Sequence, residues 1–273
     1  PDVPGVLTTD PRKVADAQLM KQISCDEMLE LASLGAAVLH PRAVEIARNY
    51  GVTLVVRSSW SEEPGTTLTS RSARPIGREG LELGRPVDGA ELVERQAVLA
   101  LSHVPDQPGV AARLFEALSA GEVNVDLIIQ ATHEGNSNDI TFTVAETDLE
   151  SARRICTDLV DAMGGELVAE GGMSKLSISG AGIMGRPGIA AGLFNTLSRQ
   201  GINLRLIATS EVKVSCVIAA AMGGKALRAA SEAFELSERQ LQINPPASGA
   251  GEPEVRGVAL DRDQAQVSVR HVP

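Results

Sequence analysis

The chain has 273 residues, about two domains' worth of sequence, with 43% hydrophobic and 22% charged residues, as in globular proteins. Its net charge of −10 argues against a nucleic-acid partner, which would need a basic surface. No apolar run approaches the ~20 residues of a membrane span, and Cys25, Cys156 and Cys216 lack the spacing of a disulfide framework or a thiolate zinc site. We therefore expect a cytoplasmic protein with no membrane partner and with cysteines that act as small buried hydrophobes.

The first polar segment, DVPGVLTTDPR at 2–12, is a strand end followed by a turn rich in polar groups. Arginine binds phosphate through two parallel hydrogen bonds, and carboxylates are ligands for Mg²⁺. The segment could therefore hold a phosphate and its metal. An ordinary polar turn with an internal pair between Asp10 and Arg12 fits the same spacing, and the spacing does not decide between them.

Helical signals follow this segment. Ser24 and Glu27 have the spacing of a capping box and predict a helix over about 25–34. Pro41 is typical of the first turn of a second helix, and the apolar run at 52–57 predicts a buried strand. Alternating helices and strands indicate an α/β unit at the front of the chain.

Two copies of one pattern make up the middle of the chain, because 108–128 matches 187–207, 79 residues later. Each copy has the order βαββαβ, which is the ferredoxin-like plan. The predicted elements, first copy before second, are strands at 97–102 and 174–179, helices at 108–120 and 187–200, strands at 123–130 and 202–208, strands at 139–145 and 212–219, helices at 148–163 and 223–235, and strands at 166–169 and 239–243.

The start of the first predicted helix of the repeat could bind a small anion. Asp106 stands in the N-cap position, and the backbone amides from Gly109 onward would point away from a positive helix end. Such an end suits a carboxylate, and Asp106, Asp126 and Gln130 could take the ammonium group of an amino acid. The alternative, an ordinary helix cap beside a polar strand edge, stays open.

The second repeat contains a glycine pattern with another possible meaning. Gly180-x-Gly182-x-x-Gly185 follows a strand and precedes a helix, and Glu211 lies downstream, as in a dinucleotide-binding site. The equivalent place in the first repeat has no such glycines, and the pattern continues as βαββαβ. We expect these glycines to allow close packing or to admit a small ligand.

A longer repeat appears at the end of the chain. The segment 87–105 recurs at 255–273, including the His-Val-Pro that ends both copies. The second copy stops where the first continues into its helix. This predicts that a third module begins near 255 and that the chain is a truncation.

Several blocks together resemble a known family. The segments 2–12, 27–45 and 56–66 resemble the end of the catalytic domain of the aspartate kinase family, whose catalytic domain has the amino-acid-kinase fold. The repeats are similar to the regulatory ACT domains of that family, notably at 139–144 and 178–188. The resemblance implies the C-terminal part of an α/β kinase domain followed by tandem ferredoxin-like ACT domains.

On this resemblance the domains are the end of the kinase domain at 1–68, a linker at 69–93, ACT domains at 94–170 and 171–248, and a linker with the start of a third ACT domain at 249–273. The implied activity is the ATP-dependent phosphorylation of the β-carboxylate of L-aspartate, the first step toward lysine, threonine and methionine. Mg²⁺ would accompany ATP, and no metal site or tightly bound cofactor is implied within the chain. The ACT domains would bind lysine and/or threonine as feedback inhibitors and would join the chains into a homo-oligomer.

The resemblance also implies site residues. The family's Lys-Phe-Gly-Gly phosphate loop is absent, so we expect the catalytic residues upstream and this chain alone to be inactive. Nucleotide contacts fall on Asp2, Leu7, Thr8, Thr9, Asp10, Pro11 and Arg12. Effector contacts fall on Asp106, Gln107, Pro108, Gly109, Val110, Ala111, Asn124, Val125, Asp126 and Gln130 in the first module, and on Ile189, Ala190, Asn203, Leu204, Ser210 and Glu211 in the second.

Two other functions compete with this one. A non-catalytic regulatory subunit of the same family, binding amino acids only, would have the same repeats. Paired RNA-binding βαββαβ domains would need stacking aromatic residues and basic grooves. With 2% aromatic residues and a net charge of −10, the chain does not fit the RNA-binding class.

Overall fold

The computed structural model describes residues 3–33, 36, 38–70, 86–133, 137–180, 183, 186–210, 212–246 and 257–258. The chain divides into two compact units. One unit contains residues 1–84 with 253–273, and the other contains residues 85–252. Among the described residues, no helix is both long enough and apolar enough to cross a membrane.

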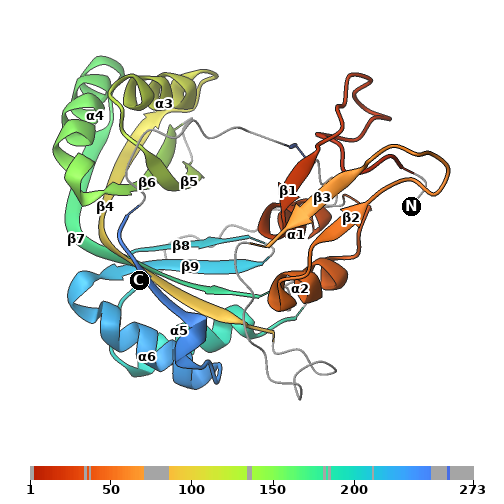
Figure 1. The fold of residues 1–273 in the computed structure, drawn as a ribbon. Coiled ribbons are helices and arrows are strands. Elements are labelled where there is room, and N and C mark those ends of the chain that lie inside the picture. Colours follow the sequence, from red (N-terminus) through yellow and green to blue (C-terminus); the bar gives the residue numbers. More distant parts are fainter. Residues whose placement is uncertain are drawn as a thin grey trace. The chain divides into compact units, whose positions relative to one another are not determined.

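The described part of the first unit contains a small sheet and two helices (Figure 1). Its elements are β1 (Gln22–Ser24), α1 (Cys25–Ser33), α2 (Pro41–Tyr50), β2 (Leu54–Val56) and β3 (Thr66–Thr69). Strand β3 lies in the middle, parallel to β1 and antiparallel to β2. The core of this unit is formed by buried side chains, among them Ile23, Met28, Leu29, Val44 and Leu68.

Both predicted helix starts are confirmed. The backbone N–H and the hydroxyl of Ser24 donate to Oε2 of Glu27 at 2.8 and 2.7 Å, and the Glu27 N–H donates back to Ser24 Oγ at 3.2 Å. Pro41 begins α2, and Nδ1 of His40 accepts from the Arg42 N–H at 3.2 Å. Each helix thus begins where a side chain satisfies a backbone amide that has no partner within the helix.

The prediction of a buried strand at 52–57 is only half right. Strand β2 covers Leu54–Val56, and Val56 is buried while Val55 is 54% exposed. Because successive side chains of a strand point to opposite faces, only one face of this strand can meet the core on which α1 and α2 pack.

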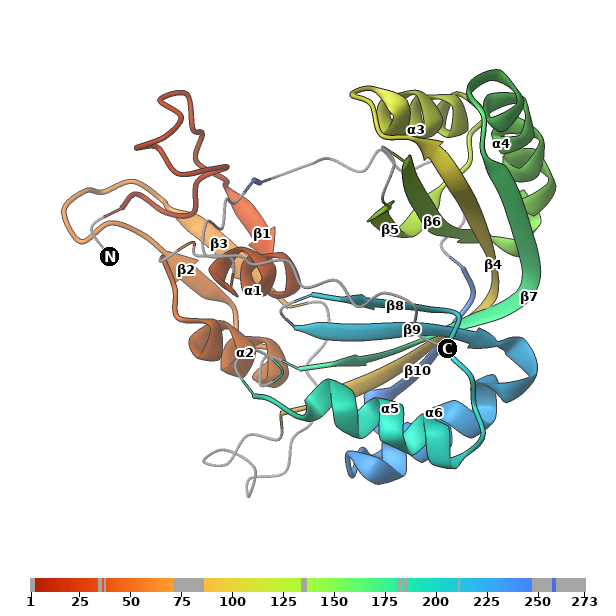
Figure 2. The same cartoon turned by 180° about the vertical axis from the view of Figure 1, so that it is seen from behind.

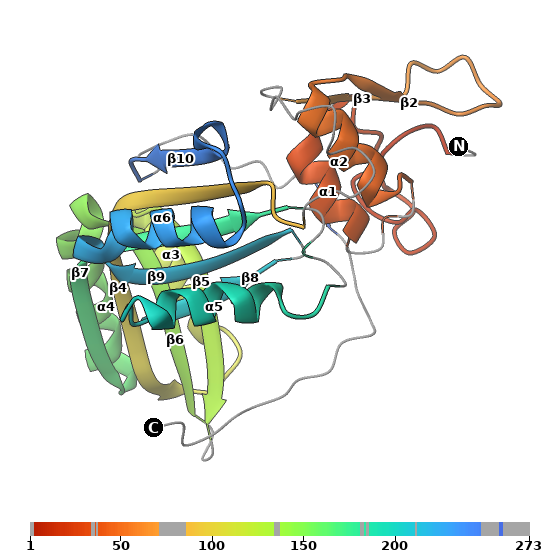
Figure 3. The ribbon, with the colours of Figure 1, turned by 90° about the horizontal axis from the view of Figure 1, so that it is seen from below.

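The second unit is built on one seven-stranded sheet, ordered β5-β6-β4-β7-β9-β8 with β10 beside β4. Figure 2 shows β4 and β7 running the length of this sheet, and Figure 3 shows α5 and α6 lying over one end of it. The elements are β4 (Gly89–Pro105), α3 (Val110–Ala120), β5 (Val125–His133), β6 (Ser137–Ala145), α4 (Leu149–Met163), β7 (Glu166–Ser179), α5 (Ile189–Arg199), β8 (Leu206–Thr209), β9 (Lys213–Ala219), α6 (Gly223–Ala233) and β10 (Leu241–Asn244).

Two long strands are shared by the two repeats, which we call module 1 and module 2. In module 1, 96–105 of β4 pairs with β6 and with the first part of β7, giving the ferredoxin-like order β7-β4-β6-β5. In module 2, 89–93 of β4 lies between β7 and β10. The predicted strands at 166–169 and 174–179 are therefore parts of one strand.

The predicted boundaries change as a result. Residues 89–93, placed in a linker by the sequence, form a strand in which Ala90 and Leu92 are buried in the core of module 2. The boundary expected between 170 and 171 falls inside β7. The modules are interlocked because each long strand passes from one core to the other. Of the segment 249–273, the described residues are 257 and 258, so the predicted third module lies outside them.

Each module has its own apolar core between the sheet and its helices. The core of module 1 includes Leu99, Leu114 and Phe142, and that of module 2 includes Leu176, Leu193 and Ile218. A smaller cluster, formed by Met173, Leu206 and Val217 together with partly buried Leu127 and Ile129, joins the modules. The two ends of the sheet are thus held together by packing as well as by the shared strands.

Candidate functional site

The N-terminal segment is held in place by a buried hydroxyl. Oγ1 of Thr66 accepts from the Val6 N–H at 2.8 Å and donates to the Met20 carbonyl at 2.6 Å. A Cβ on Gly5 would come within 2.5 Å of that same hydroxyl oxygen, so only glycine fits there. The segment therefore packs directly on β3, with its polar turn beyond it.

The predicted nucleotide residues lie on this turn. The Thr8 N–H donates to the Gln18 carbonyl at 2.9 Å, and Thr8 Oγ1 accepts from the Gln18 N–H at 3.0 Å. Nε of Arg12 donates to Oδ1 of Asp10 at 3.0 Å, and Nη2 donates to Oδ2 at 3.1 Å. The internal pair that the sequence left open is thus present. Leu7, Thr9 and Pro11 lie on the same turn, and Asp2 lies outside the described residues.

The pair sets the charge of this turn. Hydrogen bonds from Arg12 hold the pKa of Asp10 below its ordinary value, and the carboxylate raises the pKa of Arg12. The Arg12 side chain is nevertheless 88% exposed. An anion in solvent could therefore reach the guanidinium in competition with Asp10.

The first helix of module 1 begins later than predicted. Gly109 is the N-cap of α3, with φ 92°, and the Val110 N–H donates to the Gln107 carbonyl at 3.3 Å. The prediction that Asp106 caps the helix is wrong, because the turn through Gln107 and Pro108 carries the chain past it. Oδ1 of Asp106 instead accepts from Nδ2 of Asn138 at 2.8 Å.

Open space lies over the N-cap glycines of both modules. Gly188, 79 residues after Gly109, is the N-cap of α5 with φ 102°. A Cβ added to either glycine would meet nothing within 4 Å. A small ligand could thus approach both helix ends along the backbone, and the positive φ favours glycine at each position.

A buried acceptor lies beside the helix end of module 1. Asn138 is 4% exposed, and no described residue hydrogen-bonds to its Oδ1, although its Nδ2 is bonded to Asp106. An unpaired buried acceptor is unfavourable, so a donor on a ligand would be favoured there. The unpaired oxygen and the carboxylate of Asp106 together suit an ammonium group.

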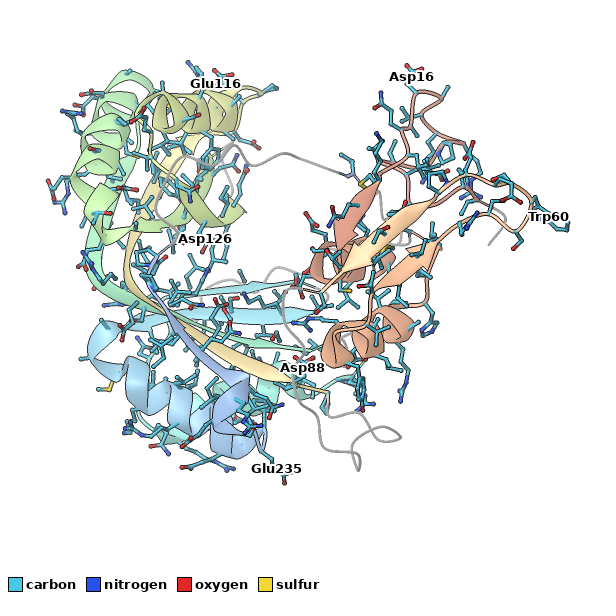
Figure 4. The ribbon with its side chains drawn as sticks, in the orientation of Figure 1. Asp16, Trp60, Asp88, Glu116, Asp126 and Glu235 are labelled. Atoms are coloured by element: carbon cyan, nitrogen blue, oxygen red, sulfur yellow. The ribbon has the colours of Figure 1, made fainter. Side chains whose placement is uncertain are left out.

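Another group of predicted residues lies elsewhere, in a pocket of about 460 Å³ within the second unit. Asn124, Val125 and Asp126 line it, but none of the residues from Asp106 to Ala111 does. Figure 4 labels Asp126 at the end of module 1 where β5 begins. The remaining lining residues are Glu91, Val93, Gln96, Val144, Ala145, Lys175, Lys213, Asn244, Pro245 and Pro246.

Charged pairs surround this pocket. Nζ of Lys175 is bonded to Oδ2 of Asp126, Nζ of Lys213 lies 2.8 Å from Oε2 of Glu91, and Nδ2 of Asn244 donates to Oε1 of Glu91 at 2.8 Å. Burial alone would raise the pKa of Glu91, but Lys213, Asn244 and the charge of Lys175 together lower it. These partners could not be recognised from the sequence, because Glu91 fell in the predicted linker and the lysines are single charges on strands.

The other predicted effector residues are spread over module 2 and one strand edge. Gln130 is exposed on β5, and Ile189 and Ala190 form the first turn of α5 against the core. Asn203 is exposed, and Leu204 packs on the core. The Ser210 N–H donates to the Lys213 carbonyl at 2.8 Å, and Glu211 lies outside the described residues.

The cysteines are buried, as predicted. Burial raises the pKa of Cys156 and of Cys216 to about 12 and also raises that of Cys25. Since the thiolate is the reactive form, these side chains are packing groups and not nucleophiles.

Comparisons with known proteins agree with both units. The family model described as ACT domain matches 102–158 and 176–234, and the one described as amino acid kinase family matches 1–58. The amino-acid-kinase match covers the segment held by Thr66 together with both helices of the first unit. The ACT matches cover the repeated helices and most of their strands.

Relatives and solved structures extend the match. The chain is 39% identical over 239 residues to an aspartokinase of Thermus thermophilus, covering 87% of this chain and 57% of that protein. It is 52% identical to the aspartate kinase of Synechocystis, with a TM-score of 0.85, covering 96% of this chain and 46% of that one. The chain therefore spans about half the length of these relatives.

A shorter solved structure is covered almost completely. The regulatory subunit of aspartate kinase from Thermus thermophilus is 35% identical, with a TM-score of 0.51. The match covers 55% of this chain and 99% of that subunit. The chain belongs to the aspartate kinase family.

Proposed function

We propose that the protein containing this chain is an aspartate kinase, which transfers a phosphoryl group from ATP to the β-carboxylate of L-aspartate. The observation that carries this proposal is the joining, in one chain, of a segment matching the amino acid kinase family to two ACT modules, together with the match of 96% of this chain to the Synechocystis aspartate kinase. The product would enter the synthesis of lysine, threonine and methionine.

The turn from Leu7 to Arg12 would take part in nucleotide binding. The exposed guanidinium of Arg12 supplies a cation for a phosphate, and the carboxylate of Asp10 is the kind of oxygen ligand that Mg²⁺ prefers. These residue types fit a nucleotide with its metal ion. The chain's own contribution is to position the turn, through Thr66 and the glycine at position 5.

The two modules would bind lysine and/or threonine and thereby lower the activity. The open helix ends at Gly109 and Gly188 suit the carboxylate of an amino acid, and Asp106 with Asn138 suits its ammonium group. Binding can shift the enzyme toward a less active state only through a difference in affinity for the two states.

Contact between copies through the modules would complete these sites. Strands β5 and β8 end the path of the sheet on its two sides, and Ile128 on β5 and Ile207 on β8 are 52% and 40% exposed. Exposed apolar side chains on strands at a sheet edge favour association. Sedimentation of the purified chain should therefore give a mass above that of one copy, and a monomer at micromolar concentration would contradict this part.

A second candidate function is supported by one comparison. The solved regulatory subunit from Thermus thermophilus is matched over 99% of its length, so a chain that only binds amino acids is a real alternative. Such a regulatory subunit would bind lysine or threonine as well but would have no kinase activity of its own.

An activity measurement separates the two functions. The complete protein that contains this chain is incubated with Mg-ATP and L-aspartate, and aspartyl phosphate is trapped as its hydroxamate. An aspartate kinase forms hydroxamate in proportion to enzyme, and millimolar lysine or threonine lowers the rate. Measurable amino-acid binding without hydroxamate formation would favour the regulatory subunit. The absence of both hydroxamate formation and amino-acid binding would contradict both functions.

A further inference from the structure

The first unit is formed by two parts of the chain that are far apart in the sequence. In the part that follows module 2, the structure describes Gly257 and Val258, and the Val258 N–H donates to the Thr8 carbonyl at 2.9 Å. Thr8 lies on the turn from Leu7 to Arg12, which is proposed to bind the nucleotide. The chain beyond module 2 therefore has a direct hydrogen bond to this turn.

Gly257 is packed closely at this contact. A Cβ at position 257 would lie 3.3 Å from Cδ2 of Leu31 on α1 and 3.4 Å from the Thr8 carbonyl oxygen. The first distance is shorter than the optimum of about 3.5–4.0 Å between carbon atoms, so a larger residue would push the segment away from α1 and the turn. The side chain of Val258, by contrast, is exposed. The contact thus depends on the backbone and on the small size of residue 257.

Thr8 is bonded on the other side to Gln18, through its own N–H at 2.9 Å and through its Oγ1 at 3.0 Å. Two segments of the chain thus hold this residue, which precedes by two positions the carboxylate of Asp10 that is paired with Arg12. A turn that is already ordered has less conformational freedom to lose when a ligand binds. The bond from Val258 should therefore favour the binding of a nucleotide at the turn.

The longer sequence repeat indicates where this segment leads. Gly257 and Val258 are the counterparts, 168 residues later, of Gly89 and Ala90, the first two residues of β4. In β4 these residues begin the long strand that continues into the sheet of module 1. A strand that began in the same way at Gly257 would run from the turn directly into the predicted third module.

We propose that Gly257 and Val258 are positioning residues for the nucleotide turn, and that the hydrogen bond from Val258 to Thr8 couples the predicted third module to ATP binding. The inference rests on the proposed nucleotide binding at this turn, to which it adds a contact from the far end of the chain. Coupling between two sites is reciprocal, so the bound nucleotide must in turn strengthen the bond from Val258.

Steady-state kinetics of the complete protein, measured as hydroxamate formation, test this role. Gly257→Val places a branched side chain against Leu31 and Thr8, and Val258→Pro removes the N–H that donates to Thr8. The conservative variant Val258→Thr keeps that N–H and changes only an exposed side chain. A second measurement is hydrogen exchange at the Val258 amide of the wild type, with and without a non-hydrolysable ATP analogue and Mg²⁺.

The expected result is a KM for ATP raised about fivefold in Gly257→Val and Val258→Pro, as for the loss of one hydrogen bond, with kcat and the KM for aspartate unchanged. Val258→Thr should keep the KM of the wild type, and the ATP analogue should slow exchange at the Val258 amide.

Two results would overturn the inference. One is a lower kcat with an unchanged KM for ATP in Gly257→Val and Val258→Pro, which would assign the contact to folding alone, and the other is exchange at Val258 that the analogue does not change. Arg12→Ala separates this failure from that of the nucleotide site. A raised KM for ATP in Arg12→Ala, with no change in Gly257→Val and Val258→Pro, would remove only the positioning role, whereas an unchanged KM in all three would contradict nucleotide binding at the turn as well.

Discussion

Lys213 and Glu91 form an ion pair 2.8 Å long between β9 and β4, although 122 residues separate them in the sequence. Strand β7 lies between these two strands, so both side chains reach over it on the same face of the sheet. This face also carries Lys175, and it is the face opposite α5 and α6. The relationship exists only because the first residues of β4 belong to module 2.

This ion pair predicts a pH dependence of stability. The pKa of Glu91 is lowered in the folded chain, so its stabilising effect is complete above the unfolded value near 4.5 and is lost as pH falls through the lower folded value. Glu91→Gln should lower the free energy of unfolding by about 0.5–1 kcal/mol at pH 7, since the pair is partly solvated. Urea titrations at pH 7 and pH 3 measure this, and the difference between variant and wild type should shrink at pH 3.

Glu170→Gln is the matched control for that measurement. Its partner Arg205 is 52% exposed and Glu170 itself is 45% exposed, so water screens this ion pair more strongly than the pair of Glu91 and Lys213. If Glu91→Gln lowered the free energy of unfolding equally at pH 7 and pH 3, that result would contradict the assignment of the stabilisation to the charged carboxylate.

The hydroxyl of Thr66 predicts a local stability effect. Thr66→Val leaves the Val6 N–H and the Met20 carbonyl without this partner, and we expect a loss of about 1–3 kcal/mol in the first unit. Hydrogen exchange at the Val6 amide should accelerate by the corresponding factor. Thr67→Val, one residue along the same strand, should leave this amide's exchange unchanged, and equal acceleration in both variants would contradict the role given to Thr66.

The buried thiols predict resistance to alkylation. Burial and the raised pKa of Cys156 and Cys216, about 12, leave little thiolate at pH 8. The native chain should therefore remain unmodified by iodoacetamide. Over the same reaction time, the chain unfolded in urea should be labelled at all three cysteines. Rapid labelling of native Cys156 or Cys216 would show that the modules open far more readily than their packed cores imply.

The exposed Arg12 predicts a selective effect on nucleotide binding. Arg12→Ala in the complete protein should raise the KM for ATP about tenfold while leaving the KM for aspartate unchanged, because a charged hydrogen bond to phosphate is lost. Lys13→Ala is the control, since Lys13 lies 3.7 Å from the same carboxylate of Asp10 but is not among the expected contacts. Equal increases of the KM for ATP in both variants would contradict a specific contact of Arg12, because they would reflect only the general loss of positive charge.

Much of the fold could be predicted because local signals are strong. The capping box at Ser24, the proline at position 41 and the strand predicted at 139–145 each depend on neighbouring residues, and the structure confirms all three. The 79-residue repeat predicted equivalent helices in the two modules, and the structure agrees, since Gly109 and Gly188 are the N-caps of α3 and α5.

The features that could not be predicted depend on contacts between residues distant in the sequence. Alternating burial shows that Ala90 and Leu92 face a core, but it does not show that the core belongs to module 2. The N-cap at Asp106 was predicted wrongly because an acidic residue before a Pro-Gly turn suits either a cap or, as found, a bond to Asn138. The pocket required knowing that Glu91, Asp126 and both lysines lie together.

The most direct test of the account concerns the two helix ends. Inhibition of hydroxamate formation by threonine and by lysine is measured in the complete protein carrying Gly109→Ala or Gly188→Ala, with Gly201→Ala as control. Gly201 also has positive φ and open space, but it lies at the other end of α5, so all three variants carry a similar backbone strain of about 1 kcal/mol. We expect the first two variants to need at least tenfold more inhibitor and the third to behave as the wild type, whereas unchanged inhibition in all three would contradict binding at the helix ends.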